Sequence, residues 1–153
     1  MSIHAAKRSD LVCINQVITE AVMAWPMPER LKRLSVPVLC YDCEDFNHYQ
    51  FILYKDQGAT VGIGAWNAQA TVVTARGDGR LLHGLYILPA YQGMGFGQQL
   101  MAQILSEAMA MGADGLQIKA ERPAITFFEH CGLQALSAGS PKDYPYQFWY
   151  QRN

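Results

Sequence analysis

A short segment near the middle of the chain constrains the fold more than any other, because three local patterns follow one another there without a break. An apolar run over 81–88 has the length of a buried strand, and apolar residues spaced by three and four over 98–111 predict an amphipathic helix. Between them lie glycines at three alternate positions, 93, 95 and 97. The segment therefore predicts a strand that leads through a glycine-rich turn into a helix that Gly112 ends.

The glycine-rich turn is typical of a loop that binds an anion. Glycines let a backbone approach a ligand closely, and the first N–H groups of the following helix have no partner within it. Positions 98 and 99 are both glutamine, so no acidic side chain repels an anion from the helix start. The G-x-G-x-G spacing differs from both the dinucleotide fingerprint and the nucleotide P-loop. We expect a phosphate-bearing ligand of another class; an ordinary strand-to-helix turn is the alternative.

Read from Gln92, the turn is Q-x-x-G-x-G after a strand that ends in I-L-P-x-Y, and this pattern resembles the acyl-CoA loop of the GNAT N-acetyltransferase superfamily. The resemblance implies that backbone amides of the turn hold the pyrophosphate of CoA, while the preceding strand runs beside the pantetheine. Acetyl-CoA is then the co-substrate, and no metal is expected. The cofactor-binding residues implied are Leu85, Tyr86, Ile87, Gln92, Gly93, Met94, Gly95, Phe96, Gly97, Gln98 and Phe128.

The remaining patterns agree with the fold that this resemblance implies, an α/β (α+β) GNAT fold in a single domain over residues 1–153. Its centre is a mixed, mostly antiparallel twisted sheet flanked by helices. Helices are expected over 10–24, 29–34, 98–111 and 123–131, with Ser9 or Asp10 capping the first, and no assignment is made over 35–47. Strands are expected over 3–6, 50–55, 59–66, 81–88, 115–120, 133–136 and 147–151, with an irregular or edge segment at 71–76.

Composition limits the partners that such a domain could have. The 153 residues are 50% hydrophobic and carry a net charge of −1, with 12 lysines and arginines that form no basic cluster. Nucleic acid is therefore a poor partner. No apolar stretch reaches the ~20 residues that cross a bilayer, and no leader-like segment opens the sequence. We expect a cytoplasmic protein without a membrane partner.

The four cysteines are too scattered for a disulfide framework, so reduced thiols are expected. Cys40 and Cys43 form a C-x-x-C, and His48 follows five residues later. Zinc needs four ligands and no second pair follows, while a thioredoxin-like motif would need a strand-to-helix turn. A metal or redox role is the alternative here, and neither is expected.

His83 is the first candidate for the base that acetyl transfer needs. An alkylamine with a pKa near ~10 is mostly protonated at neutral pH, so a group must take its proton before or during attack on the thioester. Simple alternation puts residues 81, 83, 85 and 87 on one face, which would turn His83 toward the thioester beside Ile87. In arylalkylamine N-acetyltransferases, a GNAT branch that the chain resembles here, a histidine at the matching place serves proton removal. A histidine satisfied by hydrogen bonds within the sheet is the alternative.

The thioester and its leaving group impose two further requirements. The resemblance implies that the backbone N–H of Ile87 hydrogen-bonds the thioester carbonyl and stabilises the oxyanion. The run over 124–133 looks like the family's A-x-x-x-Y-E-x-x-G-F segment, but Phe128 replaces the tyrosine that would protonate the departing thiolate. Water is the expected donor, because a thiol with a pKa of about 8.5 leaves readily. The alternative donors are Tyr86, Cys131 and Tyr144.

Glu121 stands where many relatives have an asparagine that touches the pantetheine, so it could act as a second base or bind the amine; an exposed loop carboxylate is the alternative. The resemblance also implies an acceptor pocket rich in aromatic residues, made by Trp25, Met27, Tyr41, Tyr49, Tyr144 and Tyr146. Such a pocket suits an apolar or aryl group with a cationic amine. The nearby acids that would attract it are Asp42, Glu44 and Asp45. Core aromatics and solvated acids are the equal alternative.

These observations favour an acetyl-CoA-dependent N-acetyltransferase. It would transfer the acetyl group to a primary amine, of a small molecule or a peptide, by direct attack in a ternary complex. The alternative is a catalytically weak or inactive acyl-CoA-binding protein with a regulatory or interaction role, for which Phe128 is the main argument. Phe148-Trp149-Tyr150 near the end of the sequence could support a homodimer.

Overall fold

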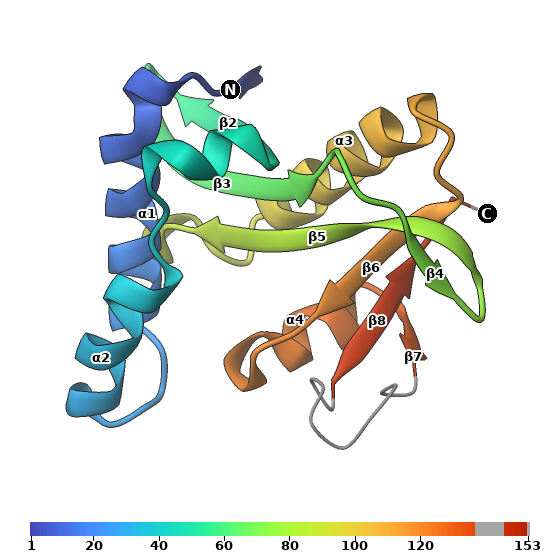
Figure 1. Cartoon of the computed structure of the whole chain (residues 1–153). Helices are drawn as coiled ribbons and strands as arrows, with labels where there is room; N and C mark the ends of the chain where they lie inside the picture. Colours follow the sequence, from blue (N-terminus) through green and yellow to red (C-terminus); the bar gives the residue numbers. More distant parts are fainter. Residues whose placement is uncertain (137–145, 153) are drawn as a thin grey trace.

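An eight-stranded sheet forms the centre of the computed structural model, which describes residues 1–136 and 146–152 (Figure 1). Its strands lie in the order β1-β2-β3-β5-β6-β8-β7, and β4 pairs with β5 off this path. All pairs are antiparallel except β5 with β6. The strands are β1 (Ser2–Ala5), β2 (Tyr49–Asp56), β3 (Ala59–Asn67), β4 (Val72–Thr74), β5 (Gly77–Ile87), β6 (Gly115–Lys119), β7 (Gln134–Leu136) and β8 (Gln147–Tyr150).

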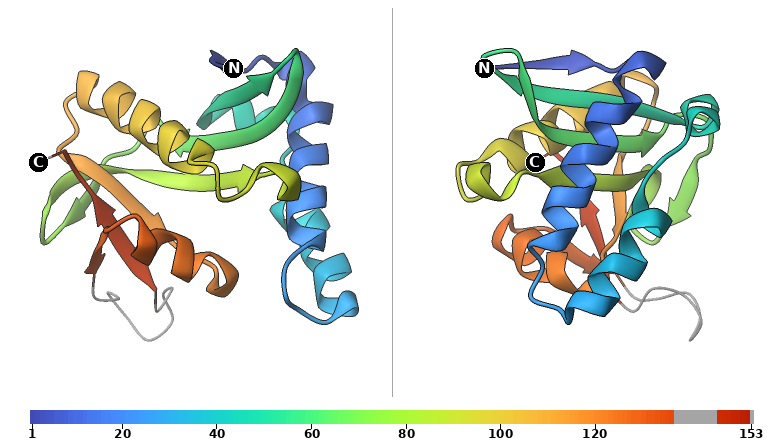
Figure 2. Two further views of the ribbon diagram at one scale, coloured as in Figure 1. Left: turned by 180° about the vertical axis from the view of Figure 1, so that it is seen from behind. Right: turned by 90° about the vertical axis from the view of Figure 1, so that its left-hand side faces the viewer.

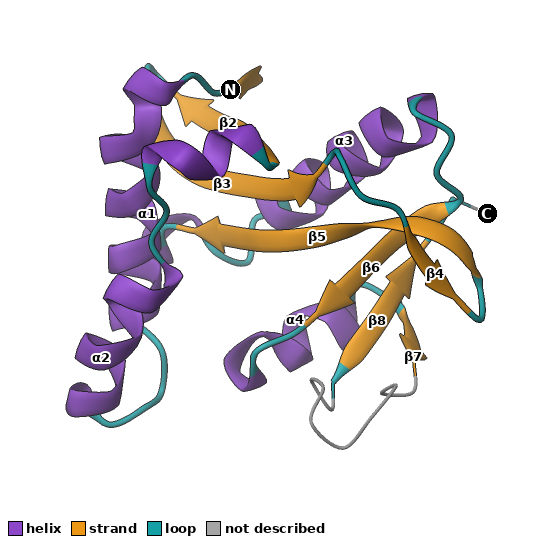
Figure 3. Cartoon of the chain, viewed as in Figure 1, coloured by secondary structure: helices purple, strands orange, loops and turns teal. Residues whose placement is uncertain are grey.

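Helices cover both faces of this sheet (Figures 2 and 3). One face carries α1 (Leu11–Met23), and α2 (Glu29–Leu39) packs beside it. The opposite face carries α3 (Phe96–Ala110), while α4 (Ile125–His130) lies near the closing strands. The expected mixed, mostly antiparallel sheet flanked by helices is confirmed. None of the helices in the described ranges is both long and apolar enough to cross a bilayer.

Alternation along β2 divides the core into two clusters. Phe51 and Leu53 pack with α1 residues, whereas Ile52 and Tyr54 pack with α3 residues. Each helix therefore buries its apolar stripe against its own face of the sheet. Glycines on β3 let α3 approach closely: a Cβ at Gly64 would lie 2.8 Å from Cδ1 of Ile104.

The sheet divides where its parallel pair ends. β6 stays beside β5 only from Gly79 to Leu82, after which β5 continues and β6 turns away (Figure 1). At the base of this division the Trp149 ring lies against Gly79 and Gly115, where an added Cβ would stand 2.6 and 2.5 Å from ring atoms. Only glycine fits between this ring and the paired strands. Among the described residues, the division leaves one edge of β5 without a neighbouring strand beyond Leu82.

Several element boundaries differ from the sequence prediction. α2 runs to Leu39 and contains Pro37, because the proline lies in the last turn, where the Cys40 N–H closes the helix on the Val36 carbonyl at 3.0 Å. The carboxylate of Asp10 accepts from the Lys7 N–H at 2.8 Å, so it caps the preceding 3-10 turn and not α1.

The unassigned segment and the predicted edge segment also have defined structure. Residues Cys43–Asn47 form a 3-10 turn that Asp42 caps, accepting from the N–H groups of Glu44 and Asp45. The segment 71–76 contains the short strand β4, which pairs with the start of β5. The predicted helix over 123–131 is a 3-10 turn (Arg122–Ala124) followed by α4.

Candidate active site

The free edge of β5 presents backbone groups to the opening between β5 and β6. The Leu88 N–H donates to the Val61 carbonyl at 2.8 Å, so Leu88 directs its backbone groups toward β3. Backbone direction alternates along a strand, so Leu85 and Ile87 direct their N–H and C=O groups away from β3. The side chain of Gln92 donates to the carbonyl oxygen of Ile87 at 3.0 Å. The amide of Ile87 therefore faces the opening, while its carbonyl is held by the following turn.

The turn after β5 leads directly into α3. Gly93 and Gly95 have φ values of +76° and +86°, which favour glycine, and an added Cβ at either would meet no atom within 4 Å. Glycine is therefore favoured at these two positions by the backbone conformation and not by a lack of space for a side chain. Gly95 is the N-cap residue of α3, and no acidic residue occupies the first turn of that helix. A helix start of this kind has the amides and the dipole that suit an anion.

Gly97 has a different role from the two glycines before it. A Cβ there would lie 2.8 Å from Cζ of Phe127, so the missing side chain lets the α4 ring pack on the start of α3. Phe127 is nevertheless partly exposed, at 37%. The contact holds the two helix ends together beside the turn.

A cavity of about 60 Å³ lies in the opening between β5 and β6. Six residues that the sequence predicts for the site line it: Trp25, His83, Leu85, Tyr86, Glu121 and Phe128. Met27 lies in the same loop as Trp25, where its N–H donates to the Trp25 carbonyl at 2.8 Å, but it is not among the lining residues. Tyr144 lies outside the described residues.

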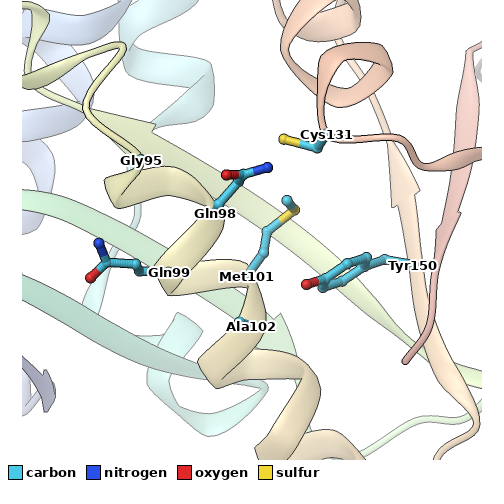
Figure 4. A pocket seen from close by; sticks show the side chains of 7 residues that line it. All are labelled: Gly95, Gln98, Gln99, Met101, Ala102, Cys131 and Tyr150. Atoms are coloured by element: carbon cyan, nitrogen blue, oxygen red, sulfur yellow. The ribbon is translucent and has the colours of Figure 1, made fainter. Parts of the chain in front are cut away.

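A second cavity of about 420 Å³ lies between the start of α3, the end of α4 and β8 (Figure 4). Figure 4 shows the Gln98 side chain directed toward Cys131, whereas Gln99 points to the other side of the helix and accepts from the Tyr54 hydroxyl at 2.8 Å. Burial raises the pKa of the Cys131 thiol, and a hydrogen bond with Gln98 acts in the opposite direction. No local pattern in the sequence links Cys131 or Tyr150 to α3, so a cavity wall made by these two residues is not predictable from the sequence.

A β-bulge turns His83 away from the face that alternation predicts. The β3–β5 register steps from Ala65 opposite Gly84 to Trp66 opposite Leu82, so His83 is the extra residue. Leu82, Leu85 and Ile87 consequently pack on the α3 side, while Gly84 and Tyr86 lie on the side of Tyr41. The predicted shared face of residues 81, 83, 85 and 87 is wrong, because one inserted residue reverses the alternation.

Two tyrosines hold the imidazole of His83. The Tyr41 hydroxyl lies 2.7 Å from Nδ1, and the Tyr49 ring stacks on the imidazole with a centroid distance of 4.2 Å. Partial burial lowers the pKa of His83 below its ordinary value, against the opposing effect of the Asp45 carboxylate. The net shift favours the neutral imidazole over the charged form.

The expected acceptor residues separate into buried and accessible ones. Tyr41 is buried in the α1 cluster, and burial above all raises its pKa far beyond the ordinary value of a phenol. Tyr49 is half-buried, and Tyr146 is exposed while its carbonyl accepts from the Ala120 N–H at 2.9 Å. The Asp45 carboxylate accepts from the Asp42 N–H at 2.7 Å, and its charge acts on both Tyr41 and Tyr49.

The sequence also matches the model of a known protein family. A family model described as "Acetyltransferase (GNAT) family" matches residues 15–133. The chain belongs to the GNAT acetyltransferase family. No curated protein matched its sequence.

Solved GNAT structures share this fold at low sequence identity. A GCN5-related N-acetyltransferase from Rhodopseudomonas palustris matches with a TM-score of 0.76 and 15% identity, over 99% of this chain and 95% of that one. The PaiA N-acetyltransferase from Thermoplasma acidophilum, solved in complex with coenzyme A, gives 0.72 and 16%, over 98% and 100%. A GNAT acetyltransferase from Brucella melitensis, solved in complex with acetyl-CoA, gives 0.61 and 20%, over 98% and 95%.

Phe128 is a wall residue of the opening in this GNAT chain. Its ring is 5% exposed and packs against Phe148 with a centroid distance of 5.7 Å. Of the alternative proton donors, Tyr86 lines the same cavity as Phe128, whereas Cys131 lines the other one.

The C-x-x-C motif and the rings of Phe148 and Trp149 lie outside the two cavities. Cys40 is half-buried beside Thr19 and Cys43 is exposed, all four cysteines are free, and the described residues contain no cluster of three or more metal-binding side chains. Phe148 and Trp149 are 5% and 1% exposed, so these rings are buried within the chain and offer no surface to a second copy.

Proposed function

We propose that this chain is an acetyl-CoA-dependent N-acetyltransferase that transfers the acetyl group to a primary amine by direct attack in a ternary complex. One observation carries the proposal above the others. The unpaired edge of β5 at Leu85 and Ile87 runs straight into the glycine turn and the start of α3. A single ligand with an amide-bearing arm and a phosphate group can therefore bind to both.

The residues present fit acetyl-CoA. The amides of the turn, from Gly93 to Gln98, would bind the pyrophosphate, and the free edge at Leu85–Ile87 would pair with the amides of the pantetheine as a neighbouring strand does. Phe128 would line the same path. The cavity beside Gln98 adjoins this helix start, and we assign the nucleotide end of the ligand to it. Crystallised members of the fold that hold CoA or acetyl-CoA support this assignment.

The chemistry requires four events at the opening. The amine nitrogen attacks the thioester carbonyl carbon, the C–S bond breaks, the amine loses a proton and the thiolate gains one. The Ile87 N–H would stabilise the oxyanion. Among the residues that line the opening, His83 and Glu121 are the two candidate acceptors of the amine's proton. Phe128 has no proton to give, so water would protonate the thiolate.

The acceptor would enter beside Trp25, next to Met27 and, by the sequence prediction, Tyr144. The aromatic rings and the Asp45 carboxylate near His83 suit a small-molecule or peptide amine that carries an apolar group. The same proposal places the enzyme in the cytoplasm without a nucleic-acid or membrane partner. A homodimer would need a surface other than Phe148 and Trp149.

The test combines binding with turnover. Calorimetry with acetyl-CoA measures the cofactor site, and release of free CoA thiol in the presence of a panel of arylalkyl, alkyl and peptide amines measures transfer. Micromolar binding together with amine-dependent thiol release is the expected result. Failure of CoA to bind at millimolar concentration would contradict the proposal.

An acyl-CoA-binding protein without significant catalysis is the second candidate, and Phe128 favours it. This residue stands where the family pattern has tyrosine, and it is buried against Phe148. Binding without transfer to any amine would favour this candidate. Gain of thiol release in Phe128→Tyr would identify the missing hydroxyl as the cause.

A further inference from the structure

The hydroxyl of Tyr41 contacts the imidazole of His83 on β5. The side chain of Asn15 holds the backbone of Tyr41 in place, because it donates to the Tyr41 carbonyl at 2.8 Å and accepts from the Tyr41 N–H at 2.9 Å. The ring is 7% exposed and packs edge-on against Phe51 with a centroid distance of 4.8 Å. The position of the hydroxyl is therefore fixed by α1 and β2.

Gly84 provides the space for this contact. A Cβ at this position would lie 2.6 Å from the Tyr41 hydroxyl oxygen. The phenol thus passes directly over the missing side chain to reach the neighbouring residue, His83, which the bulge turns toward it. Two backbone features, the glycine and the bulge, serve the same hydrogen bond.

The direction of this hydrogen bond follows from its surroundings. A phenol hydroxyl has one proton to donate, and Nδ1 of His83 lies 2.7 Å from the Tyr41 oxygen, within reach of that proton. If Nδ1 carried a proton and donated to Tyr41, the buried phenol would have to donate its own proton to a second acceptor, and leaving that proton unpaired would be costly. The favoured arrangement has Tyr41 donating to an unprotonated Nδ1, so the proton of the neutral ring lies on Nε2.

We propose that Tyr41 is a positioning residue that holds His83 as the tautomer with its proton on Nε2. His83 then acts in the opening as a hydrogen-bond donor, and the proton of the attacking amine leaves through another group, Glu121. The statement about the tautomer stands without the proposed function, while the statement about the amine's proton rests on it.

The groups around His83 act together on its protonation. Tyr41 and Tyr49 cover the ring, Asp45 in the 3-10 turn favours the charged form, and Glu121 and Lys119 line the cavity on the β6 side. A donor at Nδ1 stabilises only the neutral ring, because the imidazolium carries protons on both nitrogens. Removing that donor must therefore raise the pKa of His83.

The tautomer can be read directly from the ¹⁵N shifts of histidine-labelled protein, with His83→Gln assigning the signal among four histidines. We expect an unprotonated Nδ1 and a protonated Nε2 in the unmodified chain. Tyr41→Phe and Gly84→Ala remove the contact from its two ends, and both should raise the pKa of His83 and shift the tautomer equilibrium. Tyr49→Phe removes a neighbouring hydroxyl and should leave the tautomer unchanged.

A protonated Nδ1 in the unmodified chain would overturn the proposal, as would a lowered or unchanged pKa of His83 in Tyr41→Phe. Kinetics test the second part, because glutamine can donate a hydrogen bond but cannot take a proton. His83→Gln should stay within about tenfold of the unmodified kcat, whereas His83→Ala should lose about 100-fold. Equal losses in both variants would make His83 the base. The NMR readings are separate from the proposed function, because they need neither CoA nor turnover, whereas the kinetic readings depend on it.

Discussion

The side-chain amide of Gln92 is bonded to the main-chain oxygen of Ile87 across the turn that follows β5. This contact fixes the last peptide of the strand relative to the residues that open α3. It needs no packing, since Gln92 itself is exposed. Its contribution is therefore to alignment more than to stability.

Gln92→Ala should impair the use of acetyl-CoA without unfolding the chain. An exposed hydrogen bond contributes about 1 kcal/mol, so we expect kcat/KM for acetyl-CoA to fall roughly fivefold and the melting temperature to change little. The exposed Gln103 on α3 gives the control, and Gln103→Ala should change neither quantity. Equal kinetics in both variants would contradict the alignment role.

Gly95→Ala should weaken CoA binding because alanine resists a positive φ. The strain of about 1–2 kcal/mol predicts a loss of roughly tenfold in affinity, measured by calorimetry. Gly58 is a matched control, with a φ of +82° and equally open surroundings in the β2–β3 hairpin. Gly58→Ala should lose similar stability but keep its affinity. A parallel loss of affinity in both would mean that the turn does not touch the ligand.

Gly97→Ala should act through Phe127. The added methyl would stand 2.8 Å from Cζ of that ring, so we expect a loss of about 1–3 kcal/mol in the free energy of unfolding. Phe127→Leu in the same chain should recover most of the loss, and denaturant unfolding of the two single variants and the double variant measures the coupling. Additive effects would show that the two helix ends do not depend on this contact.

Acid should destabilise the chain partly through His83. Because the folded pKa of His83 lies below the unfolded value of about 6.5, the unfolded state binds more protons as the pH falls. Stability is therefore retained above the unfolded pKa and lost as the pH drops through the folded one. His83→Gln should show a smaller fall in melting temperature between pH 7.5 and about pH 5 than the unmodified chain. An identical fall in melting temperature in both proteins would contradict the lowered pKa of His83.

Cys131 should report on ligand binding beside α3. Burial raises its pKa, so alkylation by a thiol reagent at pH 7 should be slower than at the exposed Cys13 and Cys43. Saturating CoA should slow the reaction of Cys131 at least severalfold and leave the other two unchanged, as mass spectrometry of the labelled sites would measure. If Cys131 were labelled at the same rate with and without CoA, CoA would not occupy this cavity.

Local patterns predicted the strand, the turn and the helix at the centre of the candidate site, and contacts between distant residues account for what they missed. The strand, the turn and α3 follow one another in sequence, so glycine spacing and apolar periodicity were sufficient to find them. The helix begins two residues before the predicted start, because Gly95 in the left-handed region already ends the turn.

The environment of His83 could not be obtained in the same way. The bulge depends on how β5 pairs with β3, and the hydroxyl that bonds Nδ1 comes from Tyr41, 42 positions earlier. The residue pattern of a single strand predicts neither the bulge nor the contact with Tyr41. The helix predicted over 29–34 is also too short, because α2 continues through Pro37 to Leu39, and a proline in a last turn costs only a bond that the terminus can replace.

The short parallel pairing of β5 with β6 gives the molecule two unequal flanks. Tyr41 and the aromatic residues around it belong to the flank built from the first half of the sequence, whereas Glu121 and Phe128 belong to the other. Under the proposed function, substitutions in the first flank would change selectivity for an incoming amine while the residues of the proposed pyrophosphate site stay the same. Laboratory selection confined to α1, α2 and the following turn should then be enough to direct acetyl transfer to new acceptors.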